Sequence, residues 1–264
     1  MAELKTLDLR PGGQTAHVWE GGDANAPALL FLHPITGIPR WGDALESLAQ
    51  DFHVIAPYQP GWGPAKDDLP GARDGLDLVL FNVDLLNTLG VGSAHVVGVS
   101  IGGWIGAEIA AIRPDAVQSL TLVNPLGLWS EQYPGEDAFA QHPGFPTAVL
   151  FSNPDKRTEL LMGDRDPMDA YVGELLDLRA SAKFLWPIPD TGVGRRLMRI
   201  DTRTLIATSE HDNIVASEMG DIWRAAIPGA QSVELADSGH IADLEVPEAL
   251  ANLVRNFALE GVTA

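Results

Sequence analysis

Ser100 is the first residue whose surroundings suggest chemistry. It lies at the centre of Gly98–Gly103 (GVSIGG), between an apolar run and a helical pattern. A sharp strand-to-helix turn of this kind projects the central side chain above a sheet, beside the free N–H groups of the helix start. Gly98 and Gly102 fit this turn, because a Cβ at either place would collide across it. The pattern predicts that Ser100 is a nucleophile.

A serine hydroxyl needs a base to become a nucleophile, and an imidazole base needs a carboxylate to orient it. Asp212 follows the apolar run Thr204–Thr208, and His240 follows the run Ser232–Leu235. The carboxyl ends of parallel strands meet at one edge of a sheet. We therefore expect Ser100, Asp212 and His240 to form a catalytic triad.

Other carboxylates lie near the same two positions, namely Glu210, Asp237 and Asp243. Asp237 and Asp243 are three residues from His240, which leaves little room for either to orient the imidazole ring. Asp212 is therefore the preferred acid.

The sequence patterns around these residues predict an α/β fold. The apolar runs rich in Val, Ile and Leu are typical of strands covered on both faces, and helical patterns lie between them. The expected strands are Lys5–Arg10, Thr15–Glu20, Ala28–Leu32, Phe52–Ala56, Ala94–Val99, Gln118–Val123, Thr204–Thr208 and Ser232–Leu235. The expected helices are Trp41–Gln50, Gly75–Leu89, Ile101–Ile112, Ala216–Ala226 and Val246–Leu259. The first two strands form an antiparallel hairpin, so we predict a mainly parallel eight-stranded sheet with helices on both faces.

The alternation of strands and helices stops once, over residues 127–199. This stretch contains one strong helical pattern, Asp166–Arg179, with Asp166 as the N-cap and Pro167 in the first turn. The length of 264 residues suits one α/β domain with an insertion. We predict a core domain of residues 1–126 and 200–264, with residues 127–199 as a helical cap.

The chain resembles the α/β-hydrolase fold superfamily over almost its whole length, and within it the serine esterases and carbon–carbon hydrolases that carry a cap. Besides the serine turn and the Gly-His pair before the last helix, Phe31–Pro34 (FLHP) resembles the oxyanion loop. Gln59–Gly63 (QPGWG) resembles the turn after the next strand. The alternative acid position of the superfamily, after Gln118–Val123, holds Asn124, which cannot serve as the acid.

The oxyanion loop departs from the family pattern, because His33-Pro34 stands where His-Gly is usual. Proline has no N–H to donate. We expect the N–H groups of Ile35 and Ile101 to form the oxyanion hole, and His33 to brace the loop through hydrogen bonds. Trp104 and Trp129 are candidates for the substrate pocket.

The resemblance implies hydrolysis of a carboxylic ester or lactone through an acyl-enzyme, and the strongly negative net charge favours a neutral substrate. A carbon–carbon bond hydrolase of diketones or dienoates is an alternative, although such enzymes usually have Asn before the serine and Trp after the histidine, where this chain has Val99 and Ile241. A ligand-binding receptor or pseudo-enzyme on the same fold is the other alternative. No cofactor and no metal is expected.

Composition limits the partners. The formal net charge is −19, from 36 acids against 17 bases, so nucleic acid and anionic membranes would be repelled. There is no cysteine, and neither a secretory signal nor an apolar run of membrane-spanning length is visible. The expectation is a cytoplasmic monomer or homodimer that acts on a small molecule.

One basic cluster stands out from this acidic background, consisting of Arg195, Arg196, Arg199 and Arg203. It could clamp a carboxylate substrate, but pairing with the surplus acids of this chain is the favoured interpretation.

Overall fold

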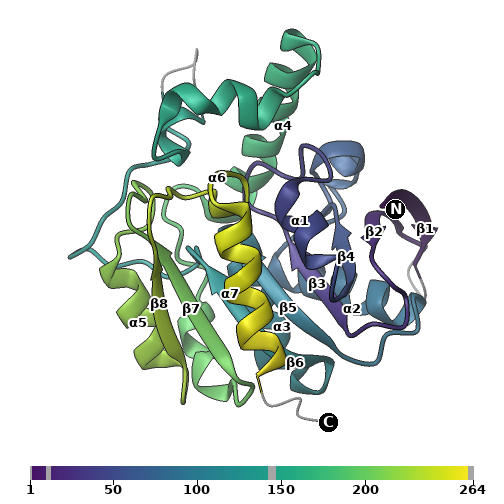
Figure 1. Ribbon diagram of the computed structural model, residues 1–264. Helices are drawn as coiled ribbons and strands as arrows, with labels where there is room; N and C mark the ends of the chain where they lie inside the picture. Colours follow the sequence, from purple (N-terminus) through teal and green to yellow (C-terminus); the bar gives the residue numbers. More distant parts are fainter. Residues whose placement is uncertain (1, 10–12, 142–146, 261–264) are drawn as a thin grey trace.

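The computed structural model describes residues 2–9, 13–141 and 147–260, and they form one eight-stranded sheet (Figure 1). The strand order is β1-β2-β4-β3-β5-β6-β7-β8. The strands are β1 (Glu3–Asp8), β2 (Thr15–Gly21), β3 (Ala28–Leu32), β4 (His53–Pro57), β5 (Ala94–Val99), β6 (Val117–Val123), β7 (Thr204–Ser209) and β8 (Gln231–Leu235). β1 pairs antiparallel with β2 and β2 with β4, whereas all other pairs are parallel. The predicted fold class is confirmed. The turn expected between the first two strands includes residues 10–12, which lie outside the described residues.

Helices cover both faces of the sheet, as Figure 1 shows. They are α1 (Asp43–Leu48), α2 (Gly75–Thr88), α3 (Ile101–Ile112), α4 (Pro167–Leu185), α5 (Glu218–Ala226), α6 (Ala242–Glu245) and α7 (Pro247–Leu259). α1 packs on α7, and α3 packs on β5 and β6 with α2 beside it. Every residue of β5 is buried, and all of α3 is buried except its last residue. Parallel strands that are covered on both faces appear in the sequence as continuous apolar runs. For this reason the predicted strand positions lie close to the observed ones.

Helix ends differ from the expectations where the signals were weak. α1 is confined to Asp43–Leu48, shorter than the expected Trp41–Gln50. α7 begins at Pro247, and the short helix α6 precedes it. Proline is preorganised for the first helical position, so it marks the start of α7 better than the apolar pattern did.

The segment between β6 and β7 contains α4, which lies above the sheet in Figure 1. The Asp166 carboxylate accepts hydrogen bonds from the N–H groups of Met168 and Asp169, so the predicted N-cap is confirmed. The helix ends at Leu185, six residues beyond the expected Arg179. The residue before a proline is disfavoured in a helix, and Trp186 precedes Pro187. Pro187 therefore marks the end of α4 in the sequence more closely than the pattern of apolar residues does.

Short helical turns complete the chain. They are Gly63–Asp68, Pro114–Ala116, Ala148–Leu150, Pro154–Lys156, Val193–Arg195 and Leu197–Arg199, with one π-turn at Thr158–Met162. Across the described residues, no helix combines the length and the apolar character that a bilayer crossing requires.

Candidate active site

Ser100 occupies the strained turn that its motif predicts. Its φ is 58° and its ψ −119°, a conformation that residues with a side chain rarely adopt. The backbone is fixed there by its neighbours. The Ser100 N–H donates to the Val123 carbonyl at 2.8 Å, and the Ser100 carbonyl accepts from the N–H groups of Gly103 and Leu126 at 3.0 and 3.1 Å. The ends of β5 and β6 therefore hold the serine in place.

The two glycines of the motif are required for different reasons. A Cβ on Gly98 would lie 2.2 Å from the Gly102 carbonyl oxygen, across the turn as expected. A Cβ on Gly102 would instead lie 2.1 Å from the carbonyl oxygen of Leu32, at the end of β3. Gly102 thus lets α3 approach the neighbouring strand, a contact that the motif alone did not reveal.

The side chains of Ser100, His240 and Asp212 form one hydrogen-bonded chain. The Ser100 hydroxyl lies 2.7 Å from His240 Nε2, and His240 Nδ1 lies 2.8 Å from Asp212 Oδ2. Because a carboxylate only accepts, Nδ1 donates to Asp212, which leaves Nε2 free to accept from Ser100. All three side chains are buried. The arrangement can move a proton from the serine to the imidazole while the carboxylate stabilises the resulting cation.

Asp212 is itself held by the chain that follows it. Its Oδ1 accepts from the N–H groups of Ile214 and Val215 at 2.8 and 3.0 Å. These bonds leave Oδ2 for the imidazole, and so they aim the carboxylate at His240.

The competing carboxylates take other positions. Glu210 and Asp237 are exposed, and the Asp237 N–H donates to Glu210. Asp243 is partly buried, and this burial raises its pKa to about 7. Among the described residues, His240 forms its carboxylate hydrogen bond with Asp212 alone.

The oxyanion loop is oriented by hydrogen bonds to the Pro34 carbonyl. That carbonyl accepts from His33 Nδ1 at 2.8 Å and from the Gly37 N–H at 3.0 Å. In a trans peptide the next N–H points the opposite way, so the Ile35 N–H points away from these partners. Within the described part of the chain, neither Ile35 N–H nor Ile101 N–H has a backbone acceptor. Both donors are available for an oxyanion.

His33 ties the oxyanion loop to the turn after β4. Its Nε2 accepts from the Gln59 N–H at 3.0 Å, so the ring proton is on Nδ1 and the ring is neutral. Complete burial lowers the pKa of His33 to about 4. His33 therefore braces the loop, as predicted, and remains uncharged at neutral pH.

Asn124, set aside in the sequence because it cannot be the acid, connects three parts of the site. Its amide nitrogen lies 3.2 and 3.1 Å from the Gly239 and His240 carbonyls, and 2.9 Å from the Ser209 hydroxyl. Its amide oxygen accepts from the Ser209 N–H at 2.9 Å. Asn124 joins the ends of β6 and β7 to the backbone that carries the imidazole. No local sequence signal indicated this role.

Glu245, which sequence reasoning also missed, holds the histidine turn from its other side. Its carboxylate accepts from the Gly239 N–H at 2.7 Å and from the Ser152 N–H at 2.9 Å. The His240 N–H donates to the Leu150 carbonyl at 2.8 Å. The segment between β6 and β7 therefore contributes directly to the placement of His240.

A mainly apolar cavity of about 150 Å³, also lined by the exposed Glu136 and Asp137, adjoins the oxyanion loop. Its walls include Ile35, Leu126, Trp129, Leu185 and Ile214. We call it the front cavity. The Leu126 N–H donates to the Ser100 carbonyl at 3.1 Å, and Ile35 belongs to the oxyanion loop, so the front cavity adjoins the serine turn.

Trp104 does not line the front cavity. Its indole N–H donates to Glu108, one helical turn later, at 3.2 Å, and the ring lines a separate groove along α2 and α3. Because residues four apart on a helix meet, Trp104 pairs with its own helix. Of the two tryptophans expected in the substrate pocket, the structure brings only Trp129 to the front cavity.

Three of the four arginines in the basic cluster make structural contacts, and Arg195 is exposed. Arg196 forms a two-pronged ion pair with the buried Glu108, at 2.6 and 2.5 Å. Arg199 and Arg203 donate to backbone carbonyls at the ends of α3 and α7. The favoured pairing with acids thus holds for Arg196, whereas Arg199 and Arg203 bind helix ends, where cations are stabilised by the dipole.

One group of potential metal ligands is present among the described residues. It consists of Glu210, His211 and Asp237, whose ligand atoms lie within 4.8 Å of one another and which are all exposed. It lies on the surface, and none of its members hydrogen-bonds to the triad among the described residues.

Comparison with known proteins places this geometry in a family. Residues 29–253 match the model of the Alpha/beta hydrolase family, so the chain belongs to that family. A protein of Pseudomonas savastanoi pv. phaseolicola assigned as the carbamate hydrolase RutD is 29% identical over 240 residues, which cover 85% of this chain and 90% of the relative. Lipase 1 of Psychrobacter immobilis is 26% identical, covering 97% of this chain and 84% of the relative.

A solved structure also shares the fold. The 2-hydroxy-6-oxo-6-phenylhexa-2,4-dienoate hydrolase of Rhodococcus sp. strain RHA1 superposes with a TM-score of 0.75 at 20% identity, covering 97% of this chain and 99% of that one. With the family model and the hydrolase relatives, the protein is a hydrolase with an α/β-hydrolase fold.

Proposed function

We propose that this hydrolase cleaves a small, neutral carboxylic ester or lactone through an acyl-enzyme on Ser100. The hydrogen-bonded chain from Asp212 through His240 to Ser100 carries the proposal. The small apolar front cavity beside Ile35 supports an uncharged acyl group.

In this mechanism the Ser100 oxygen attacks the carbonyl carbon, and its proton passes to His240 Nε2. Asp212 stabilises the imidazolium, and the N–H groups of Ile35 and Ile101 stabilise the oxyanion. The tetrahedral intermediate collapses, and the leaving alkoxide takes the proton from Nε2. Water, deprotonated by His240, then attacks the acyl-enzyme and releases the acid. Each oxyanion donor is worth about 3 kcal/mol of transition-state stabilisation.

We also propose that residues 127–199 act as a cap on a core of residues 1–126 and 200–264. Trp129 and Leu185 of this segment line the front cavity, and the Leu150 carbonyl accepts a hydrogen bond from the His240 N–H. A cap with these contacts would both select the substrate and hold the imidazole.

An activity panel tests the reaction class. We would measure kcat/KM for an aryl acetate, a γ-lactone, an aryl carbamate and a vinylogous 1,5-diketone with the wild-type protein and Ser100→Ala. We expect the acetate or lactone to be turned over fastest, and Ser100→Ala to lose about three orders of magnitude or more. Faster turnover of the diketone would favour a carbon–carbon hydrolase, and a fully active Ser100→Ala would refute the acyl-enzyme.

A further inference from the structure

The carbonyl group of Ile35 is held by two side chains from other parts of the chain. The Trp62 indole N–H donates to this carbonyl at 3.1 Å, and the Ser181 hydroxyl lies 3.2 Å from it. Trp62 belongs to the turn after β4, and Ser181 belongs to α4. All three residues are fully buried. The residue whose N–H we assign to the oxyanion hole is therefore also anchored through its own carbonyl.

Ile35 lies between two peptide planes, and both planes are held by hydrogen bonds. The preceding plane contains the Ile35 N–H and the Pro34 carbonyl, which accepts from His33 and Gly37. The following plane contains the Ile35 carbonyl, which accepts from Trp62. Because the two planes join at the Ile35 Cα, the N–H can turn away from an oxyanion only if at least one of these hydrogen bonds breaks.

The two donors to the Ile35 carbonyl are not equivalent. An indole has a single N–H, and the Ile35 carbonyl is the acceptor of the Trp62 N–H among the described residues. A hydroxyl also has one proton, but the Ser181 oxygen lies 2.9 Å from the Asp177 carbonyl, one helical turn earlier, as well as near Ile35. The Ser181 proton can serve either carbonyl, whereas Trp62 is committed to Ile35.

The turn that carries Trp62 is itself fixed on several sides. The side chain of Gln59 exchanges two hydrogen bonds with Asn82 of α2, at 3.1 and 2.8 Å. The Trp62 backbone N–H donates to the Gln59 carbonyl at 3.0 Å. The Trp62 ring stacks on Phe184 of α4, with ring centroids 6.2 Å apart and 10° between the planes. The indole is thus a rigid support for the oxyanion loop.

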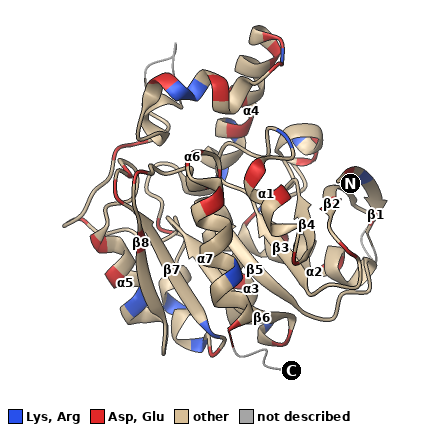
Figure 2. Ribbon diagram, viewed as in Figure 1, with Lys and Arg blue, Asp and Glu red and all other residues tan. Residues whose placement is uncertain are grey.

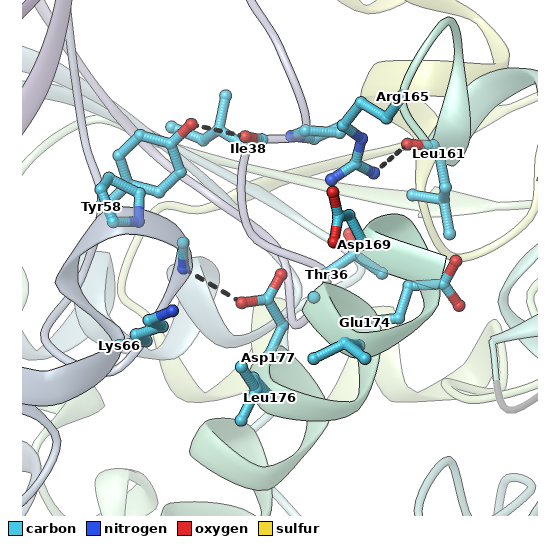
Figure 3. A pocket seen from close by; sticks show the side chains of 15 residues that line it. Thr36, Ile38, Tyr58, Lys66, Leu161, Arg165, Asp169, Glu174, Leu176 and Asp177 are labelled. Atoms are coloured by element: carbon cyan, nitrogen blue, oxygen red, sulfur yellow. Dashed lines mark hydrogen bonds between the residues drawn. The ribbon is translucent and has the colours of Figure 1, made fainter. Parts of the chain in front are cut away.

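Helix α4 is tied to the same turn. The Asp177 carboxylate accepts from the Gly63 N–H at 3.1 Å, and Figure 3 shows Asp177 on the side of α4 that faces this turn. Ser181 follows Asp177 by four residues, so the two side chains lie on one face of the helix. The segment between β6 and β7 therefore contacts the oxyanion loop as well as the backbone of His240.

We propose that Trp62 and Ser181 are positioning residues of the oxyanion hole, which aim the Ile35 N–H by holding the Ile35 carbonyl. This inference rests on the proposed acyl-enzyme mechanism, in which that N–H stabilises the oxyanion. Both residues act through Ile35 and not on the substrate. A misaligned donor weakens binding of the transition state more than binding of the substrate, so its loss lowers kcat and leaves KM nearly unchanged.

Steady-state kinetics with an aryl acetate tests the proposal in Trp62→Phe, which keeps an aromatic ring and removes the indole N–H. We expect kcat to fall about tenfold, less than the roughly 10²–10³-fold lost when an oxyanion donor is deleted, because the donor is displaced and not removed. KM should change by less than about threefold. Ser181→Ala should lower kcat about threefold, as expected for one shared hydrogen bond.

Trp223→Phe is the matched control. Trp223 is also fully buried, but it lies on α5 and its indole nitrogen has no hydrogen-bond partner among the described residues. This variant should keep the kcat of the wild type. Circular dichroism and thermal melting establish that each variant is folded.

The double variant Trp62→Phe/Ser181→Ala tests whether the two side chains share one acceptor. In Trp62→Phe the Ser181 proton can turn fully to the Ile35 carbonyl and compensate in part. The double variant leaves that carbonyl without either donor, so kcat should fall about 100-fold, more than the product of the single losses. Losses that simply multiply would contradict a shared acceptor.

Inhibition by phenylboronic acid gives a readout that a merely structural role would not move. Its boron bonds to the Ser100 oxygen, the serine proton passes to His240, and the resulting anionic tetrahedral boronate resembles the tetrahedral intermediate. The Ki should rise in Trp62→Phe and Ser181→Ala by about the same factor as kcat/KM falls. A variant that is only less stable would melt at a lower temperature with an unchanged Ki.

The proposal is overturned if folded Trp62→Phe keeps kcat and Ki within about twofold of the wild type, or if Trp223→Phe loses as much activity. If Trp62→Phe does not fold, unchanged kcat and Ki in Ser181→Ala overturn it. Failure of the proposed function gives a different result, because the boronate would then not inhibit the wild type and Ser100→Ala would remain active.

Discussion

The front cavity and a larger hollow of about 450 Å³ beside α4 (Figure 3) lie next to the same short loop, yet the polar groups near them differ in their hydrogen bonding. Beside the front cavity, Ser100, His240 and Asp212 are buried and paired with one another. In the larger hollow, the Asp177 carboxylate accepts a hydrogen bond from the Gly63 N–H and has no acid or base among the described residues as a hydrogen-bond partner. A paired set can pass a proton between its members, whereas Asp177 has no hydrogen-bonded group with which to exchange one. The comparison shows that pairing, more than the presence of a carboxylate beside a hollow, distinguishes a site that can carry out acid–base chemistry.

We expect the largest effect from Asp212→Asn, which disrupts the hydrogen bond between Asp212 and His240. An amide at this position would favour the wrong imidazole tautomer, and kcat should fall about 10³–10⁴-fold. Steady-state kinetics with an aryl ester measures the loss. Asp237→Asn is the control, because Asp237 is exposed and its positive φ of 55° suits asparagine. Equal losses in the two variants would contradict the assignment of the acid.

Asn124→Gly removes the amide that ties the imidazole-bearing turn to the sheet. Glycine tolerates the φ of 46° at this position, so the backbone should be kept. Because a displacement of about 1 Å can cost about 10²-fold in rate, we expect kcat to fall about 10- to 100-fold with little change in KM. An unchanged kcat in a folded variant would mean that Glu245 and Leu150 position His240 without it.

His33, which braces the loop between the two spaces, should make stability depend on pH. Burial lowers the pKa of His33 from 6.5 to about 4 in the folded protein, so between these values the unfolded chain binds more protons. The stabilisation is complete above about pH 6.5 and is lost as the pH falls toward 4.

Urea unfolding of the wild type and His33→Asn measures this contribution. The difference in unfolding free energy between them should be about 2 kcal/mol smaller at pH 5 than at pH 7. The exposed His211→Asn should keep the pH dependence of the wild type. A difference for His33→Asn that is independent of pH would show that the imidazole is not desolvated as described.

The smallest expected effect concerns substrate charge. Figure 2 shows acidic residues on α4, α5 and around α1, and the net charge is −19. Arg196, Arg199 and Arg203 are engaged elsewhere. A neutral ester should be preferred a few-fold over an anionic one of equal size, and about 0.5 M salt should reduce this preference by screening. An anionic substrate favoured at low salt would mean that a cation reaches the front cavity.

The sequence predicted the grouping of Ser100, His240 and Asp212 better than the surroundings of these residues, for a physical reason. Ser100, Asp212 and His240 each follow an apolar run, and parallel topology alone brings such positions together. The place of Trp104, the bridging role of Asn124 and the larger hollow beside α4 depend on contacts between distant segments. Gly63 and Asp177, for example, are 114 residues apart and meet only because α4 packs against the turn after β4. No periodicity or motif encodes such a contact.

Covalent labelling tests the central claim most directly. The protein would be treated with a fluorophosphonate probe at neutral pH, digested and analysed by mass spectrometry, with Ser100→Ala and Asp237→Asn treated in parallel. The account predicts one adduct per chain on the peptide that contains Ser100, formed also in Asp237→Asn and absent in Ser100→Ala. Labelling of another serine, or no labelling of the folded wild-type protein, would contradict it.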